Sequence, residues 1–151
     1  MSITAWRIVK SIYADSAFTG EGSKRFPGRW NLRGDSMVYT AGSESLAVLE
    51  MLVHLNNSDK LPSYTLFRLD IPERLIEVPT QLPSGWQETE YSPFVPQFGS
   101  DWFRTSSTCV LRVPSVIATS EFNYLINPLH SDFLKITVGP PQPFRFDPRL
   151  V

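Results

Sequence analysis

Residues 43–55 read Ser-Glu-Ser-Leu-Ala-Val-Leu-Glu-Met-Leu-Val-His-Leu, and this stretch predicts the main helix of the chain. Ser43 is a suitable N-cap, because its hydroxyl can accept a hydrogen bond from a free N–H of the first turn. Good helix formers fill residues 44–55 without glycine or proline, and the polar residues 56–58 end the pattern. Apolar residues cover nearly the whole circumference, so the helix is expected to pack on more than one side.

One carboxylate, Glu50, stands inside this apolar run. Its neighbours one helical turn away are Leu46, Val53 and His54. A buried carboxylate needs a cation or hydrogen-bond donors, and otherwise its pKa rises. Glu50 is therefore a candidate acid, base or cation-stabilising group. The alternative is a salt-bridged glutamate at the edge of the helix.

The rest of the chain favours short strands. Segments enriched in β-branched and aromatic residues predict strands at 5–9, 37–40, 64–71, 110–113, 116–118, 135–138 and 144–146. Short helices are further candidates at residues 131–134 and near Trp102. The expected class is α+β, with mainly antiparallel strands and few helices.

Residues 79–100 form the least regular stretch. Pro79, Pro83, Pro93 and Pro96 argue against a long helix and against a central strand. We expect a surface excursion anchored by aromatic side chains.

The composition indicates one folded domain over residues 1–151. A length of 151 residues is typical of a single domain, and 42% hydrophobic residues are enough for a core. Intrinsic disorder is thereby excluded as the overall description. The charge is 14 Lys and Arg against 15 Asp and Glu, so no global field attracts nucleic acid or an anionic membrane.

Cysteine usage and the N-terminus favour a reducing cytoplasm. Cys109 is the single cysteine, and with two histidines it cannot build a structural zinc site unaided. His54 and His130 have no matching third ligand, so no metal site is expected. The first residues lack the pattern of a signal peptide, and no stretch approaches about 20 apolar residues. Neither secretion nor membrane spanning is expected.

Residues 20–31 read Gly-Glu-Gly-Ser-Lys-Arg-Phe-Pro-Gly-Arg-Trp-Asn and predict a loop. Glycines let a ligand approach the backbone, and Arg29 offers a planar fork of donors for phosphate. The alternative is a solvated turn with incidental charges. A dinucleotide-binding fingerprint is rejected, because Arg25 stands where its third glycine belongs.

Four further polar residues are weaker candidates. Tyr39 closes a predicted strand just before the Glu50 helix, so the two side chains can converge at one end of the sheet. A half-buried core tyrosine is the alternative. Ser115 follows a proline at a strand kink, and turn formation explains residues such as Asn123 and Asn127 equally well.

Several motifs occur together in a characteristic order. They are Gly20-Glu21-Gly22-Ser23, Gly28-Arg29-Trp30-Asn31, Tyr39, Leu46-Ala47-x-Leu49-Glu50, Leu111-Arg112-Val113-Pro114-Ser115 and Asn123-Tyr124-Leu125-Ile126-Asn127-Pro128-x-His130. In this order and spacing the chain resembles the RES domain family over most of its length. The family is named after an arginine, a glutamate and a serine, which fall here on Arg29, Glu50 and Ser115. Pro27 and Ser131 depart from the family pattern, where a glycine and a proline are expected.

The resemblance implies a toxin of a bacterial type II toxin–antitoxin pair. Such toxins have a fold similar to that of ADP-ribosyltransferases, act on NAD, and are neutralised by an Xre-type helix-turn-helix antitoxin. NAD is then a substrate, and neither a prosthetic group nor a metal is expected. Cleavage of the nicotinamide–ribosyl bond leaves water, phosphate or a protein side chain as the open choice of acceptor.

The resemblance also implies roles for individual residues. Glu50 would stabilise the positive charge that develops on the ribose, as carboxylates do in glycoside hydrolysis. Arg29 and Tyr39 would bind NAD, and Asn31 and Ser115 would add neutral hydrogen bonds.

Two other classes of function stay open at this point. A nucleic-acid-binding module would use a basic patch of Lys24, Arg25, Arg29 and Arg33, whose net charge Glu21 and Asp35 reduce from +4 to +2. This reading is less favoured, and no direct contact with nucleic acid or membrane is expected. A purely structural protein would show no activity that depends on Glu50.

Overall fold

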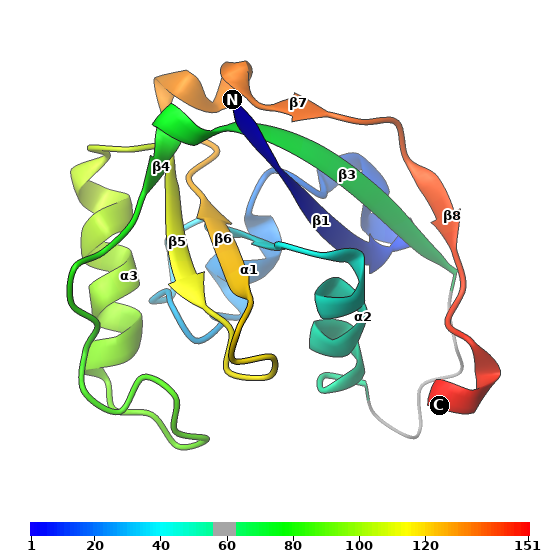
Figure 1. Ribbon diagram of the computed structural model, residues 1–151, viewed down its shortest axis with the longest axis horizontal. Coiled ribbons are helices and arrows are strands. Elements are labelled where there is room, and N and C mark those ends of the chain that lie inside the picture. Colours follow the sequence, from blue (N-terminus) through cyan, green and yellow to red (C-terminus); the bar gives the residue numbers. More distant parts are fainter. Residues whose placement is uncertain (56–62) are drawn as a thin grey trace.

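The computed structural model describes residues 1–55 and 63–151 (Figure 1). The predicted helix stop at residues 56–58 lies outside the described residues. Within the described ranges, eight strands form one sheet. They are β1 (Ser2–Lys10), β2 (Val38–Ala41), β3 (Tyr64–Pro72), β4 (Ile76–Glu77), β5 (Val110–Pro114), β6 (Phe122–Ile126), β7 (Thr137–Val138) and β8 (Gln142–Phe144).

The strand order is β4-β5-β6-β2-β1-β3-β7, and β8 pairs with β3 beside β7. All pairs are antiparallel except β4 with β5. The longest pair joins β1 to β3 in continuous register from Ser2–Pro72 to Lys10–Tyr64. With few helices around this sheet, the predicted α+β class with mainly antiparallel strands is confirmed.

Three α-helices and four short 3₁₀ turns accompany the described strands. They are α1 (Glu21–Arg25), α2 (Glu44–Leu52), α3 (Phe94–Thr105), η1 (Ser11–Ser16), η2 (Glu73–Leu75), η3 (Ser131–Lys135) and η4 (Pro148–Leu150). The helix α2 begins after Ser43, as predicted, because the Ser43 hydroxyl accepts a hydrogen bond from the backbone N–H of Leu46 at 3.0 Å. The turn η3 confirms the short helix expected at 131–134.

The helix α3 contradicts the prediction that residues 79–100 contain no long helix. Pro93 is its N-cap residue and Pro96 lies in its first turn. First-turn N–H groups have no partner within a helix, so a proline there removes no helical hydrogen bond. In Figure 1 the helix flanks β4 and β5 at one end of the sheet.

Three predicted strand positions are wrong in detail. Residues 116–118 form a bend, because the Ser115 hydroxyl accepts hydrogen bonds from the N–H groups of Ile117 and Ala118. The predicted strand at 135–138 is shortened to β7, since Lys135 ends the turn η3. The strand predicted at 144–146 lies earlier, as β8. The strands β4 and β6 were not predicted.

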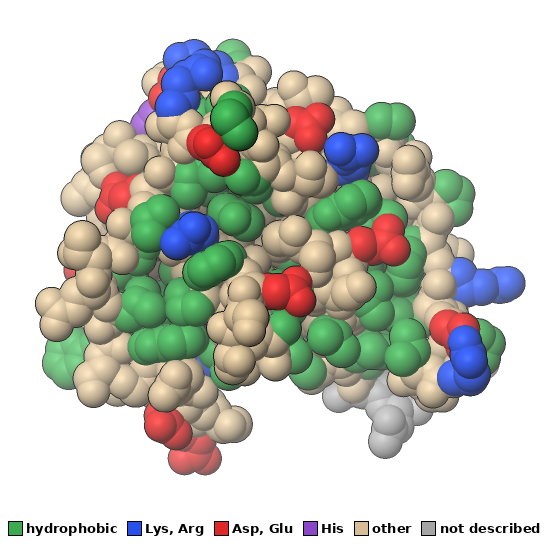
Figure 2. Space-filling view, viewed as in Figure 1, with side chains coloured by type: hydrophobic (Ala, Val, Ile, Leu, Met, Phe, Trp, Pro, Cys, Tyr) green, Lys and Arg blue, Asp and Glu red, His purple; other side chains and the backbone are tan. Residues whose placement is uncertain are grey.

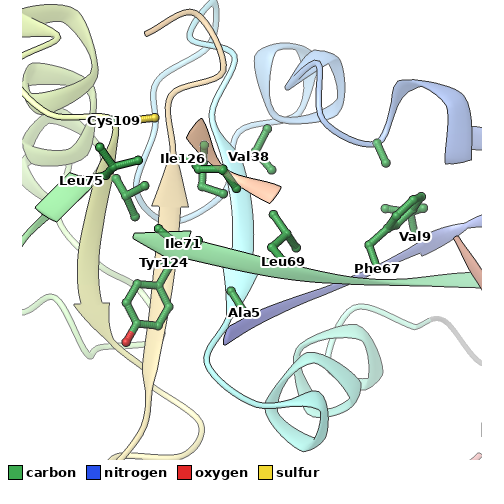
Figure 3. Packing of buried hydrophobic residues seen from close by; sticks show 13 residues of the cluster. Ala5, Val9, Val38, Phe67, Leu69, Ile71, Leu75, Cys109, Tyr124 and Ile126 are labelled. Atoms are coloured by element: carbon green, nitrogen blue, oxygen red, sulfur yellow. The ribbon is translucent and has the colours of Figure 1, made fainter. Parts of the chain in front are cut away.

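The largest buried cluster lies on one face of the sheet (Figure 3). Val38, Leu69 and Ile126 come from β2, β3 and β6 and are fully buried. A second cluster of aromatic and aliphatic side chains packs α3 against the β5–β6 region and Trp30. A third lies between α2 and the β1–β3 pair. The last two clusters fix the positions of the two helices that flank the candidate site.

Candidate active site

The glycine-rich loop is folded against the start of β2. Gly20 has a φ of +75°, and a Cβ atom there would lie 2.1 Å from the carbonyl oxygen of Ser36. Only glycine fits both conditions. The Ser23 hydroxyl donates to the carbonyl oxygen of Met37 and ties the short helix α1 to the strand.

Asn31 organises this loop from its interior. The side chain is 1% exposed. Its Oδ1 accepts hydrogen bonds from the Gly28 N–H at 2.9 Å and from the Tyr39 hydroxyl at 2.5 Å. Its Nδ2 donates to the carbonyl oxygens of Ser23 and Asp35. The Asn31 amide is thus engaged within the protein, and a direct contact with NAD stays a prediction.

Tyr39 projects from β2 beneath the same loop. Its hydroxyl accepts a hydrogen bond from the Trp30 N–H at 3.1 Å while donating to Asn31. Burial raises the pKa of Tyr39, so the phenol is neutral at physiological pH. Gly28 lies directly on the ring, because a Cβ at residue 28 would be 2.8 Å from the Tyr39 Cζ and hydroxyl oxygen.

The guanidinium of Arg29 contacts the proline-rich segment. Its Nη1 donates to the carbonyl oxygens of Trp86 at 2.9 Å and Glu88 at 2.6 Å. Its Cζ lies 4.5 Å from the centre of the Tyr91 ring. Trp86 also stacks on Trp30, with ring centres 6.4 Å apart. The proline-rich segment is therefore anchored by aromatic side chains, as expected.

Glu50 is half-buried on α2, two residues before its end at Leu52. Loss of hydration raises the pKa of its carboxyl, while hydrogen bonding with Asn123 and the charges of His54 and Arg29 lower that pKa by less. The structure therefore brings Glu50 together with Arg29, the cation, and Asn123, the donor.

Asn123 and Tyr91 were not singled out for the site. Asn123 was read as a turn residue, but it lies on β6, opposite Ala41 of β2. The Phe, Tyr, Leu and Ile residues around Asn123 are the signal that could have identified the strand, and a polar side chain among them is the signal that could have marked a site candidate. For Tyr91 the sequence carries no comparable signal.

Ser115 is fully buried at the end of β5. Its hydroxyl accepts two backbone hydrogen bonds of 3.0 Å, from Ile117 and Ala118, and so shapes the turn to β6. That turn is linked to α2, because the Ser43 hydroxyl donates to the Glu121 carboxylate at 2.6 Å. A direct contact between Ser115 and NAD stays a prediction.

The basic patch considered for nucleic acid is divided in the structure. Lys24, Arg25 and Arg33 line a shallow hollow of about 590 Å³ with Glu21, and Arg29 is not part of it. On the face shown in Figure 2, basic side chains lie in a few separate places among apolar and uncharged ones, and acidic side chains adjoin some of them. Neither observation favours a continuous basic track for a polyanion.

Over residues 1–55 and 63–151, no three His, Cys, Asp or Glu side chains are placed to share a metal ion. The same residues include no helix with the length and apolar character needed to cross a membrane.

Comparison with known proteins identifies the family. The family model of the RES domain matches residues 4–147. A protein named Toxin Res from Photorhabdus laumondii is 40% identical over 149 residues, which are 97% of this chain and 96% of the relative. A Prs ADP-ribosylating toxin from a Sphingobium strain is 35% identical over 158 residues, covering 100% of this chain and 98% of the relative.

A solved structure shares the fold. The crystal structure of the M. tuberculosis MbcT–MbcA toxin–antitoxin complex contains a chain that superposes with a TM-score of 0.74 at 16% identity. The superposition covers 95% of this chain and 85% of that one. This similarity supports the fold alone, whereas the sequence matches extend over nearly the whole length. On this evidence, the chain belongs to the RES domain family.

Proposed function

We propose that the protein is the toxin of a toxin–antitoxin pair and consumes NAD by cleaving its nicotinamide–ribosyl bond. The proposal includes action in the cytoplasm and a single catalytic domain over residues 1–151. Relatives named Toxin Res and Prs ADP-ribosylating toxin support it, because ADP-ribosylation takes the ADP-ribosyl group from NAD.

The observation that carries the proposal is the surroundings of Glu50. The carboxylate of Glu50 is half-buried, and both Asn123 and the positive charge of Arg29 act on it. Departure of nicotinamide leaves positive charge on the ribose. A fixed carboxylate stabilises that charge more strongly in a partly dehydrated site than in water.

The other site residues bind and orient NAD in this proposal. Arg29 pairs with the diphosphate, and the Tyr39 ring packs against the nicotinamide. Asn31 holds the Gly28 N–H and the Tyr39 hydroxyl through its own hydrogen bonds, so it positions both groups as well as offering a contact to NAD. Ser115 shapes the turn between β5 and β6 and would offer NAD a neutral hydrogen bond.

The acceptor of the ADP-ribosyl group distinguishes three reactions. Water makes the protein an NAD glycohydrolase and phosphate makes it a phosphorylase. A protein side chain makes it a mono-ADP-ribosyltransferase, the alternative that the name of the Sphingobium relative supports.

The first test follows free nicotinamide by chromatography after incubation of the purified protein with NAD, with and without phosphate. Glu50→Gln is expected to lower the rate by roughly 100- to 1,000-fold, the range seen when one group that stabilises developing charge is removed. Glu44→Gln is the matched control, because Glu44 is an exposed glutamate of the same helix. Circular dichroism checks that both variants are folded.

A second assay uses labelled NAD in a cell lysate, followed by intact-protein mass spectrometry. Label on a polypeptide identifies the transferase, and labelled ADP-ribose or its phosphate ester identifies the other two reactions. Absence of nicotinamide release in the first assay, together with absence of any labelled product in the second, would contradict the proposed cleavage.

The proposed partner is an Xre-type helix-turn-helix antitoxin, since a free NAD-consuming enzyme poisons its own cell. Co-expression with the product of the adjacent gene is expected to yield a complex that releases no nicotinamide. A complex that retains full activity would contradict the neutralising role.

A further inference from the structure

We propose that Tyr91, with the backbone of residues 86–88, positions Arg29 so that one edge of its guanidinium receives a diphosphate group. The inference rests on the proposed function and adds a positioning residue to the site. Arg29 makes two hydrogen bonds through Nη1.

A guanidinium carries five N–H groups, two on each Nη and one on Nε. Both hydrogens of Nη1 are directed to backbone carbonyls, those of Trp86 and Glu88. In the part of the chain that the structure describes, no hydrogen bond or ion pair uses Nε or Nη2 of Arg29. Nε and Nη2 form the edge that binds two oxygens of a phosphate or carboxylate at once.

The Tyr91 ring fixes the plane of the guanidinium. The distance of 4.5 Å from Cζ to the ring centre is within the range of a cation–π contact. The two carbonyls fix rotation within that plane, so the free edge has a defined direction before any ligand binds. An arginine held in this way loses less conformational freedom on binding than a solvated one.

The segment that carries these groups is itself anchored. Trp86 and Tyr91 pack against the cluster beneath α3, and Trp86 stacks on Trp30, the residue after Arg29. The segment that binds the Arg29 guanidinium is therefore itself packed against the loop that carries Arg29.

The charge at this position favours a diphosphate. The groups that hold Arg29 are neutral carbonyls and a neutral ring, so its positive charge has no hydrogen-bonded counterion among the described residues. Arg29 acts on the Glu50 carboxyl through space, which places its charge in the neighbourhood of the proposed reaction. In NAD the diphosphate is attached to the ribose whose bond is cleaved.

The test measures KM and kcat for NAD and, separately, the Kd for ADP by calorimetry. Tyr91→Leu keeps apolar bulk and removes the aromatic face, while Tyr91→Phe keeps the face. Tyr91→Leu is expected to raise KM and the Kd for ADP by about 3- to 30-fold, with kcat changed less, and Tyr91→Phe to stay within about 3-fold of wild type. Tyr13→Ala is the control, because Tyr13 is an exposed tyrosine on η1.

Arg29→Lys separates charge from geometry, since lysine keeps the charge and lacks the two-donor edge. It is expected to weaken ADP binding at least as much as Tyr91→Leu. Thermal unfolding of each variant shows whether it is folded at the assay temperature. If Tyr91→Leu is unfolded, a Tyr91→Phe variant that binds ADP as tightly as wild type supports the role of the ring, and one weakened more than 10-fold overturns it.

The outcomes distinguish this inference from the function on which it rests. An unchanged KM and an unchanged Kd in folded Tyr91→Leu would overturn the positioning role while nicotinamide release by the wild type upholds the function. A wild type that binds ADP with the expected order of variants but releases no nicotinamide would contradict the function and support the positioning. A wild type with no affinity for ADP would overturn the diphosphate assignment.

Discussion

At the scale of single residues, the half-buried carboxylate of Glu50 lowers the stability of the folded protein. Its pKa is raised because the loss of hydration outweighs the help from Asn123, His54 and Arg29. A raised carboxyl pKa means that the folded protein binds the proton more tightly than the unfolded chain does. The ionised form is therefore unfavourable in the folded state, and the proposed catalytic carboxylate lowers the stability of the fold.

The sign of this effect predicts how Glu50→Gln changes the free energy of unfolding with pH. Below the usual pKa of 4.5, Glu50 is protonated in both states and glutamine is a near equivalent. As pH rises above that value the wild type loses stability relative to the variant, until the pH passes the folded-state pKa. Urea unfolding from pH 4 to pH 8 should show a stability gain for Glu50→Gln that grows and then levels off. A constant difference between the two proteins at all pH values would contradict the assignment.

Gly28 supports a second prediction. An added methyl group would overlap the Tyr39 ring at 2.8 Å, so Gly28→Ala should displace that ring from the site. We expect a loss of about 1–3 kcal/mol in stability and about 10- to 100-fold in kcat/KM for NAD. Urea unfolding and the nicotinamide assay measure the two effects.

The matched control is Gly22→Ala. Gly22 lies on the exposed helix α1, and a Cβ there has nothing within 4 Å. Alanine should stabilise the protein by about 0.5–1 kcal/mol without changing activity. Equal behaviour of the two alanine variants would show that contact with Tyr39 is unimportant.

At the scale of elements, the start of α2 connects two parts of the candidate site. Ser43 caps the helix that carries Glu50 and donates to Glu121, in the turn that follows Ser115. One hydroxyl therefore fixes both the helix and the turn between β5 and β6.

Ser43→Ala is expected to lower the free energy of unfolding by about 1 kcal/mol or slightly more, because it removes the cap and the bond to Glu121 together. Thermal and urea unfolding measure this loss. Ser45→Ala, on the exposed side of the same helix, should change stability by less than about 0.5 kcal/mol. A Ser43→Ala variant as stable as Ser45→Ala would contradict the capping role.

The elements that the sequence predicts best are those with strong local patterns. The helix α2 has a cap and uninterrupted helix formers, while β1 and β3 are rich in β-branched and aromatic residues. The helix candidate near Trp102 is confirmed by α3, but its start at Phe94 was missed because the prolines fall in the first turn, and the usual rule applies to helix interiors. The strand β6 was missed because Asn123, its second residue, has a low strand propensity, which pairing with β2 and β5 on both sides overrides.

The candidate site likewise contains residues that the sequence predicts and contacts that it does not. Arg29, Tyr39 and Glu50 could be proposed from the order of their motifs, before any geometry was known. Their partners could not, because Trp86 is 57 positions from Arg29 and nothing local to either residue encodes the contact. The hydrogen bond between Tyr39 and Asn31 likewise depends on how the loop closes over β2.

At the scale of the whole molecule, α3 braces the loop that carries Arg29. Gly99 meets the backbone of Trp30 so closely that a Cβ would lie 1.8 Å from the Trp30 carbonyl oxygen. The adjacent Ser100 is fully buried, and its hydroxyl accepts a hydrogen bond from the Leu32 N–H at 2.8 Å. The helix α3 thus holds the backbone of Trp30 and Leu32 in place, next to Arg29.

Gly99→Ala should therefore weaken the whole fold as well as the site. Two backbones would have to separate, so we expect a loss of about 3 kcal/mol in urea unfolding. Gln97→Ala, on the exposed side of α3, should change stability by less than about 0.5 kcal/mol. A Gly99→Ala variant of native stability would contradict the close packing of α3 on Trp30.

The stacked pair of Trp30 and Trp86 gives the protein an intrinsic spectroscopic signal. Two indoles with centres 6.4 Å apart and planes inclined by 29° are close enough for their electronic transitions to couple. One indole lies on the Arg29 loop and the other on the segment that grips Arg29. Any ligand that shifts that segment alters the coupling, so ultraviolet circular dichroism can follow binding in the unlabelled protein.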